Sequence, residues 1–384
     1  MLLCCIAAAF LCYMLCGYPV LLFLWARLRP ARRPAAEFVP RTVTVLLPVH
    51  NGARYLRRKL ESLLALDYPR ELMEIVVLSD GSTDDTERIA GEFCARGVRL
   101  VSLARGGKAA ALNAGMAQAA GEILFLTDVR QPLDPGALRA LVSRFADPSV
   151  GAACGELIIR DGATQDETDI GVYWRYEKWI RRQLDRAGSL VVVTGCIFAL
   201  RRCLAVPLPP EMLVDDAFLP ACVSLAGYRI VFEEGARAYD EPISLETEFG
   251  RKVRTLAGLF QLVRALPRLL LPFVNPLFFH FFSYKLGRLL MPHALILLAA
   301  ASFWLPRPWA ALLVGAQALF YGAALANGLV PRHWRSKPVF SAARTFVVLM
   351  AASFCAASVL LVPAARLWKV TGAETAPRRK AAAG

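Results

Sequence analysis

The chain has 384 residues, of which 56% are hydrophobic and 20% are charged, and its mean hydropathy is +0.44. The apolar share exceeds the roughly 45–50% of ordinary soluble proteins, and the charged share excludes a chain that lies wholly in a membrane, so we expect one soluble domain and several spans. The net charge of +14 gathers beside apolar runs. This placement favours contact with anionic lipid over binding of nucleic acid.

Residues 1–27 are predicted to form an N-terminal transmembrane helix. Residues 2–26 carry no charge and are long enough to cross about 30 Å of hydrocarbon. No basic segment precedes this run and no cleavage pattern follows it, which indicates an uncleaved anchor. Arginines directly after the run place its carboxyl end in the cytoplasm, namely Arg27, Arg29, Arg32 and Arg33.

Residues 40–265 are predicted to form a cytosolic α/β domain. Short apolar runs rich in β-branched residues alternate four times with helical periodicity. The predicted strands are 41–49, 73–80, 98–103 and 122–128, and the predicted helices between them are 53–66, 83–97 and 108–121. This alternation predicts a mostly parallel sheet with helices on both faces, and ligands bind such sheets at the carboxyl ends of the strands.

The carboxyl-terminal third is predicted to return to the membrane. In residues 266–288 two prolines, Pro272 and Pro276, interrupt the apolar run, so an interfacial helix is expected there. Residues 289–368 are expected to hold about three transmembrane helices, and residues 369–384 a flexible tail. The ten cysteines show no C-x-x-C spacing and are interpreted as buried thiols in a reducing compartment.

Polar residues follow the predicted strands where a ligand would bind. Asp80 and Asp128 each end a strand, and Lys108 begins a helix after two glycines. Asp80 could bond the base or ribose of a nucleotide, Asp128 could hold a divalent cation on two phosphates, and Lys108 could face phosphate. Each also has an ordinary structural interpretation, as a turn, a helix cap or an exposed lysine.

Four segments together resemble the donor-binding half of family 2 glycosyltransferases. They are PVHNGARYL, SDGSTDDT, GGKAAALNAG and LFLTDVRQ, in this order and at these intervals. Membrane-integrated members such as poly-N-acetylglucosamine, hyaluronan and cellulose synthases share an N-terminal span, a cytosolic GT-A domain, an interface helix and C-terminal spans. The resemblance therefore implies a GT-A fold and sugar transfer.

The resemblance also assigns roles to donor-side residues. Pro48, His50, Asn51 and Asp80 match residues that contact the nucleotide, usually uridine. Lys108 matches a residue near the diphosphate, and Asn113 lies in the same nucleotide-sugar-binding segment. Asp128 matches the first aspartate of D-x-D, which coordinates Mg²⁺ or Mn²⁺, whereas Arg130 stands at the second.

On the acceptor side the resemblance implies a catalytic base. Asp216 holds the position of the family's base, beside Asp215. Like-charge repulsion would raise the pKa of one of the two if they are close, although the pair could instead be the acidic start of a helix. Thr194 and Gly195 match the segment that lines the acceptor side. Arg254 matches the arginine of Q-x-x-R-W, which meets the leaving diphosphate, and could also lie on anionic lipid.

The sequence thus predicts an inverting enzyme that transfers a sugar from a UDP-sugar to a polysaccharide or other glycan. It is expected in the cell's inner (plasma) membrane as a multi-pass protein with a cytoplasmic catalytic domain. A lipid acceptor, either polyprenyl phosphate or a glycolipid, is the alternative. A transporter with a nucleotide-binding domain is disfavoured, because His293 is the only ionisable residue in the C-terminal apolar runs 289–306, 308–330 and 345–365.

Overall fold

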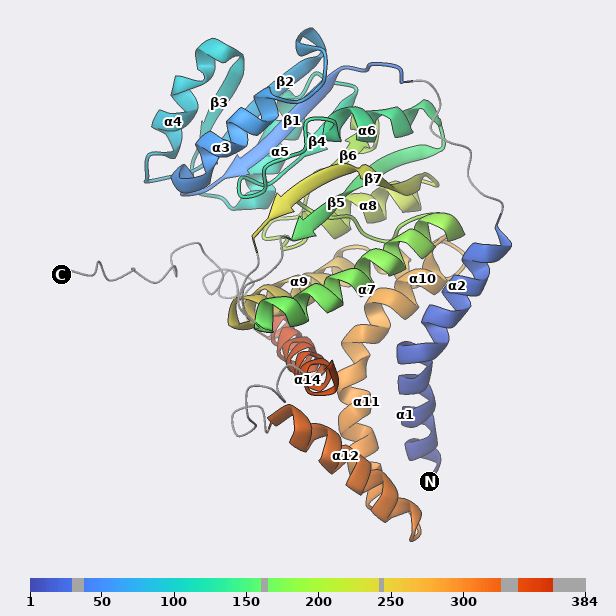
Figure 1. The fold of residues 1–384 in the computed structure, drawn as a ribbon. Helices are drawn as coiled ribbons and strands as arrows, with labels where there is room; N and C mark the ends of the chain where they lie inside the picture. The colour runs from blue at the N-terminus through green and yellow to red at the C-terminus, as the bar shows by residue number, and fades with distance from the viewer. Residues whose placement is uncertain (30–37, 160–164, 242–244, 326–337, 362–384) are drawn as a thin grey trace, which may run out of the picture.

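The structure is a computed structural model that describes residues 1–29, 38–159, 165–241, 245–325 and 338–361 (Figure 1). A sheet with its flanking helices occupies one end of the molecule, and long apolar helices occupy the other. Two helices, α7 (Gln165–Ala187) and α9 (Leu245–Ala265), lie between these parts. The expected tail at 369–384 falls outside the described residues.

The sheet has seven strands in the order β3-β2-β1-β4-β6-β5-β7. Neighbours among β1 to β4 are parallel, β6 runs antiparallel to β4 and β5, and β7 is parallel to β5. The strands are β1 (Val43–Val49), β2 (Met73–Asp80), β3 (Val98–Leu103), β4 (Ile123–Leu126), β5 (Val150–Ile159), β6 (Phe198–Arg201) and β7 (Arg229–Asp240). The predicted mostly parallel sheet is confirmed, and the carboxyl ends of β1 to β4 meet the start of β6 at one edge.

The central strands are apolar throughout because helices cover both faces of the sheet. Alternate side chains of β1 and β2 point to opposite sides, as the period of two in a strand requires. One core contains Leu46, Val76 and Leu78, and the other contains Val45, Leu47 and Val77. The flanking helices are α3 (Ala53–Leu64), α4 (Thr86–Glu92), α5 (Lys108–Gln118), α6 (Ala137–Ser143) and α8 (Asp215–Leu225).

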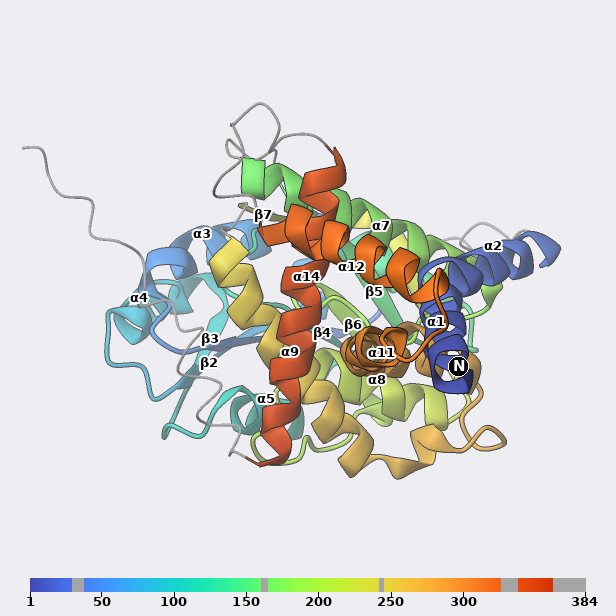
Figure 2. The same ribbon diagram turned by 90° about the horizontal axis from the view of Figure 1, so that it is seen from below.

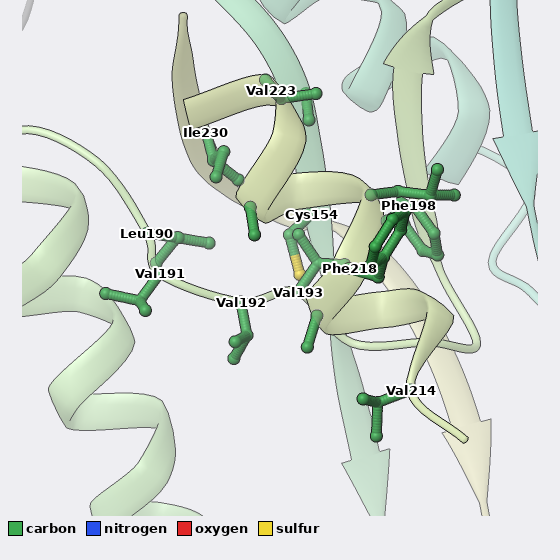
Figure 3. Packing of buried hydrophobic residues seen from close by; sticks show 14 of the residues in the cluster. Cys154, Leu190, Val191, Val192, Val193, Phe198, Val214, Phe218, Val223 and Ile230 are labelled. Atoms are coloured by element: carbon green, nitrogen blue, oxygen red, sulfur yellow. The ribbon is translucent and has the colours of Figure 1, made fainter. Parts of the chain in front are cut away.

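Apolar packing also holds α8 against the sheet. Figure 3 shows Phe218 and Val223 of α8 beside Phe198 of β6 and the segment 190–193. All of these side chains are buried, with at most 8% of their surface exposed. This packing fixes the first turn of α8, which carries Asp215 and Asp216, next to the segment that carries Thr194 and Gly195.

Three described helices are long and apolar enough to cross a membrane: Leu2–Leu28, Phe278–Ser302 and Ala343–Leu360. The first combines α1 (Leu2–Cys12), a π-turn at Tyr13–Gly17 and α2 (Tyr18–Leu28). The second combines α10 (Phe278–Phe281), a π-turn at Phe282–Leu286 and α11 (Gly287–Ser302). The apolar helix α12 (Trp309–Leu325) is shorter. Seen from below, α14 (Pro338–Ala356) runs beside α9 and contacts α12 (Figure 2).

The helix Phe278–Ser302 runs across the boundary that the sequence places at residue 288. Lys285 and Arg288 suggested that boundary because charged residues usually flank a span. Arg288 instead bonds Glu177 of α7, so the beginning of this apolar helix is held against α7. The stretch between α9 and this helix is shorter than the sequence predicts. It consists of the four-residue turn Pro267–Leu270 and the residues that follow up to Leu277.

Candidate active site

Asp80 closes the loop that follows β3. Asp80 is 3% exposed, and its carboxylate accepts hydrogen bonds from the backbone N–H groups of Gly106 and Gly107, at 2.7 and 3.0 Å, and pairs with Arg105. Gly81 has a φ of +59°, and a Cβ there would lie 2.8 Å from the Arg105 nitrogen. The loop that presents Lys108 is thus fastened to the end of β2.

The segment after β1 is fastened to the same loop region. Nδ1 of His50 lies 2.9 Å from the backbone oxygen of Asp80, and Asn51 adopts a φ of +49°. The Asn51 side-chain oxygen accepts a bond from the backbone N–H of Thr83 at 2.8 Å. Pro48 lies beside Leu78 in the register of β1 and β2. The structure therefore brings Pro48, His50 and Asn51 together with Asp80, as the sequence predicts.

Lys108 joins the two halves of the candidate site. Its Nζ lies 2.9 Å from an oxygen of Asp128 after β4 and 3.0 Å from an oxygen of Asp215 at the start of α8. Burial lowers the pKa of Lys108, but the two carboxylates outweigh burial and hold the pKa well above its usual range. The sequence placed Asp215 on the acceptor side, whereas the structure places it with the donor-side residues Lys108 and Asp128.

Asp216 lies next to this ion-paired group. Burial, followed by the charge of Asp215, raises the Asp216 pKa to about 6, and Lys108 opposes both effects. Repulsion between the two neighbouring carboxylates was predicted and acts in the expected direction, although burial has the larger effect. A carboxylate with a pKa near 6 is ionised at neutral pH and is still basic enough to accept a proton.

Gly195 leaves room at the Asp216 carboxylate. A Cβ at this glycine would lie 3.1 Å from Oδ2 of Asp216, closer than side chains normally pack. The segment is held by a bond from the Thr194 N–H to the Cys154 sulfur at 3.0 Å, and by contact of the Thr194 hydroxyl with Arg181. The backbone N–H of Val193 bonds the Asp216 carbonyl at 3.1 Å. Thr194, Gly195 and Asp216 thus form one local unit.

Arg254 of α9 lies close enough to the same carboxylates for their charges to influence it. Burial lowers its pKa, while the charges of Asp128 and Asp216 act in the opposite direction. Helix α9 therefore supplies a cation to the region where the resemblance places a leaving diphosphate. Asn113 is placed differently, because both atoms of its amide bond the backbone of Leu208, at 2.8 and 2.9 Å.

Arg130 is neutralised by a residue that the sequence did not single out. It lies 2.5 Å from an oxygen of Asp240, the last residue of β7, and Gln131 bonds the same carboxylate at 2.9 Å. Exchanging an aspartate for Arg130 therefore does not leave an uncompensated positive charge beside Asp128. Only the meeting of β7 with the β4 loop reveals this partner, because Asp240 is 110 residues away along the chain.

A buried lysine supports the β4 loop from beneath. Lys59 of α3 is 1% exposed, and its Nζ bonds the hydroxyl of Thr127 at 2.7 Å and the carbonyl of Gln131 at 2.6 Å. Burial lowers the Lys59 pKa to about 7. Helical periodicity alone could have indicated that this lysine is buried, since Lys59 falls on the apolar face of α3 with Leu56 and Leu60. Sequence reasoning missed this residue.

The carboxylates suit a divalent cation on a diphosphate. No group of three or more metal-ligating side chains is assembled within the described part of the chain. However, Asp128 and Asp215 converge on the Lys108 ammonium, and Oδ2 of Asp215 is a buried atom without a hydrogen-bond partner among the described residues. Oxygen atoms that already surround one cation are suitable ligands for Mg²⁺ or Mn²⁺ when phosphates complete the set.

The fold and site define an α/β domain whose charged residues gather where strands end and helices begin. Residues 44–205 match the family model described as glycosyl transferase family 2. The chain is also 27% identical to a probable glycosyltransferase YdaM of Bacillus subtilis over 56% of this chain and 54% of that protein. It is 28% identical to a poly-beta-1,6-N-acetyl-D-glucosamine synthase of Staphylococcus epidermidis, over 50% and 48%. Residues 44–205 thus carry the similarity to family 2 glycosyltransferases.

A solved structure extends the likeness to nearly the whole chain. It is the mannosyltransferase PcManGT of Pyrobaculum calidifontis in complex with GDP-Man and Mn²⁺, with a TM-score of 0.72 and 25% identity. The match covers 94% of this chain and 99% of that chain. By contrast, the chain spans about half the length of the curated relatives it matches. The GT-A fold is confirmed.

Proposed function

We propose that the protein is an inverting glycosyltransferase that moves a sugar from a nucleotide-sugar donor to an acceptor at the cytoplasmic face of the inner membrane. One observation carries the proposal. The half-buried Asp216 carboxylate, with a pKa of about 6, lies directly beside the ion-paired group Lys108, Asp128 and Asp215. A base and a diphosphate-binding cation are therefore adjacent, as a single displacement requires.

In this mechanism the donor's diphosphate binds near Lys108, Asp128 and Arg254, and its nucleoside lies against the loops of Asp80 and Asn51. The acceptor hydroxyl attacks the anomeric carbon, and its proton passes to Asp216. The bond from that carbon to the diphosphate breaks, and the nucleoside diphosphate departs with the bonding electrons. Lys108 and Arg254 stabilise the charge that develops on the leaving group. Asp128 and Asp215 are the residues that would hold a bound Mg²⁺ or Mn²⁺, which would neutralise diphosphate charge.

The nucleotide of the donor is open to a direct test. Uridine is usual where the motifs are shared, whereas the mannosyltransferase with the whole-chain match was solved with GDP-Man. The full-length protein in detergent should release UDP or GDP from one member of a panel of UDP- and GDP-sugars when membrane lipids are present. Release should depend on Asp216 and on Mg²⁺ or Mn²⁺. If no nucleoside diphosphate is released from any donor, the proposal is wrong.

The acceptor has two candidates. A glycan acceptor is supported by the similarity to a poly-beta-1,6-N-acetyl-D-glucosamine synthase. A lipid acceptor is supported by the helix Phe278–Ser302, which is apolar and long enough to cross a membrane and is tied to α7 by the bond between Arg288 and Glu177. Thr255, at the position where processive members carry tryptophan, favours a short product over a long polymer, and Oγ1 of Thr255 bonds the Arg251 carbonyl at 2.9 Å within α9.

A further inference from the structure

We propose that Lys59 and Thr127 are positioning residues that hold the turn 194–197 against the Asp216 carboxylate. A bridge of hydrogen bonds runs from Lys59 through Thr127 to the carbonyl of Cys196, and it fixes the donor side of the site relative to the acceptor side. This inference rests on the proposed function, because it assigns these residues a part in the same transfer reaction.

The Thr127 hydroxyl joins segments that lie far apart in the sequence. It accepts a hydrogen bond from Nζ of Lys59 at 2.7 Å and donates one to the carbonyl oxygen of Cys196, also at 2.7 Å. The direction of the bridge is fixed, because an ammonium group only donates and the proton of the hydroxyl is left for the carbonyl. All three residues are at most 4% exposed, so water has little access to these bonds.

One end of the bridge belongs to the donor side. Thr127 directly precedes Asp128, whose carboxylate lies 2.9 Å from Nζ of Lys108. Lys59 also bonds the carbonyl of Gln131 at 2.6 Å. A single buried ammonium group therefore holds the loop after β4 on both sides of Asp128.

The other end of the bridge belongs to the acceptor side. Residues 194–197 form a turn that is closed by a hydrogen bond of 3.0 Å between its last N–H and its first carbonyl. Cys196 lies inside this turn, and its neighbour Gly195 is so close to Asp216 that a Cβ there would lie 3.1 Å from Oδ2. The bond to the Cys196 carbonyl therefore helps to set where the turn lies against the Asp216 carboxylate.

Stability alone does not account for a lysine at position 59. Lys59 lies on the apolar face of α3 with Leu56 and Leu60, and the two oxygen atoms that it bonds are uncharged. A buried ammonium group is costly unless an opposite charge pairs with it. The lysine is better explained by the loop and the turn that it holds in place.

The position of the turn matters because the reacting groups come from opposite ends of the bridge. The anomeric carbon arrives with the diphosphate, which is assigned to the side of Asp128, whereas the proton goes to Asp216. A single displacement needs the acceptor hydroxyl aligned between the two, and a misplacement of about 1 Å can lower a rate about a hundredfold. Loss of the Thr127 bond should therefore lower the rate more than it weakens donor binding.

Thr127→Val tests this role, because valine has the shape of threonine but lacks the hydroxyl. In the full-length protein in detergent we expect release of nucleoside diphosphate from the panel of UDP- and GDP-sugars to slow about tenfold or more. The dissociation constants of UDP and GDP with Mn²⁺ should change by less than about threefold. Thr127→Ser should keep most of the rate, because serine retains a hydroxyl that accepts one bond and donates another.

Thr44→Val is the matched control. Thr44 is as buried as Thr127 and lies in the same sheet, but its hydroxyl bonds Glu74 at 3.0 Å near the starts of β1 and β2. We expect it to leave the rate of nucleoside diphosphate release within about twofold of wild type at a temperature where both are folded. An equal loss of rate in Thr44→Val and Thr127→Val would overturn the positioning role.

The double variant Lys59→Met with Thr127→Val separates positioning from stability. In Thr127→Val the buried ammonium group of Lys59 loses one of its two acceptors, so removing the charge as well should raise the melting temperature above that of the single variant. The rate should not recover, because the Cys196 carbonyl still lacks its donor. A rate that rises together with the melting temperature would mean that the two residues serve stability only.

Hydrogen–deuterium exchange measures the bridge without the reaction. The backbone amides of residues 193–197 should exchange at least about tenfold faster in Thr127→Val than in wild type, and no faster in Thr44→Val. Unchanged exchange in Thr127→Val would overturn the bridge. Faster exchange there, with no nucleoside diphosphate released by the wild-type protein from any donor, would support the bridge and refute the proposed function instead.

Discussion

The donor side and the membrane side of the active site are built differently. Donor-side residues follow parallel strands or begin helices, so Asp80, Lys108 and Asp128 meet at one edge wherever the strand order is kept. The membrane side is assembled from α7, α9 and the helix Phe278–Ser302, whose contacts span more than a hundred residues of sequence, as between Glu177 and Arg288. Short motifs describe the first arrangement, whereas the second is visible only in the folded chain.

The largest effect is expected where the two sides meet. Asp216→Asn should lower the rate of transfer by about 10²–10⁴, because the amide cannot accept the acceptor's proton. Donor affinity should stay within a few-fold, since Lys108 contacts Asp128 and Asp215 instead. Transfer rates and donor binding by the purified protein measure both quantities. Near-normal turnover would remove Asp216 from the role of base.

The next largest effect is expected at Lys59, the buried lysine that supports the β4 loop. Lys59→Met should weaken metal activation or donor binding by about tenfold, the usual cost of losing a residue that orients a metal ligand. The methionine fills similar space but cannot hold Thr127 and Gln131. Activity titrated with Mn²⁺ and with donor measures the loss. The matched control is Lys178→Met, a lysine paired with Glu156 away from this loop; equal losses in both variants would mean general destabilisation.

The pH dependence reports on the same base. Because the pKa of Asp216 is raised to about 6, the rate should fall as pH drops through about 6, where the base becomes protonated. Stability should show the opposite trend. The folded pKa lies above the unfolded value near 3.9, so ionisation of Asp216 costs folding free energy as pH rises from about 4 to 6. Asp216→Asn should therefore melt higher than wild type at pH 8, and the gap should close near pH 4.

The smallest effect is expected at the ion pair of Arg130 and Asp240, since Arg130 stands where the family's D-x-D motif has its second aspartate. Arg130→Asp brings a new carboxylate beside Asp128 and Asp240, and we expect the transfer rate to fall several-fold. The exchange Arg130→Asp with Asp240→Arg should recover part of the loss, because it restores the ion pair in reverse. Rates of the two single variants and the double variant give the coupling. Simple additivity of the two changes would indicate that the pair does not influence the reaction.

The fold of the catalytic domain was predictable because local patterns and tertiary contacts agree there. Four apolar runs with β-branched residues alternate with helical periods, and they form β1 to β4, whose neighbours are parallel as predicted. The structure of residues 266–288 was harder to predict from the sequence. Prolines and charges predicted an interfacial segment, yet from Phe278 the chain is one helix whose Arg288 is neutralised by α7. Helix boundaries inferred from charge fail when a distant residue compensates that charge.

For the site, the sequence by itself determined which side chains stand at strand and helix ends, because the period and direction of parallel strands bring those ends together. Only the tertiary structure decided how they pair. It joined Lys108 to Asp128 and Asp215, gave Arg130 its partner Asp240, and placed Lys59 beneath the β4 loop. Ion pairs depend on distances of a few ångströms between distant segments, and burial of these groups sets their pKa values, so packing alone could establish them.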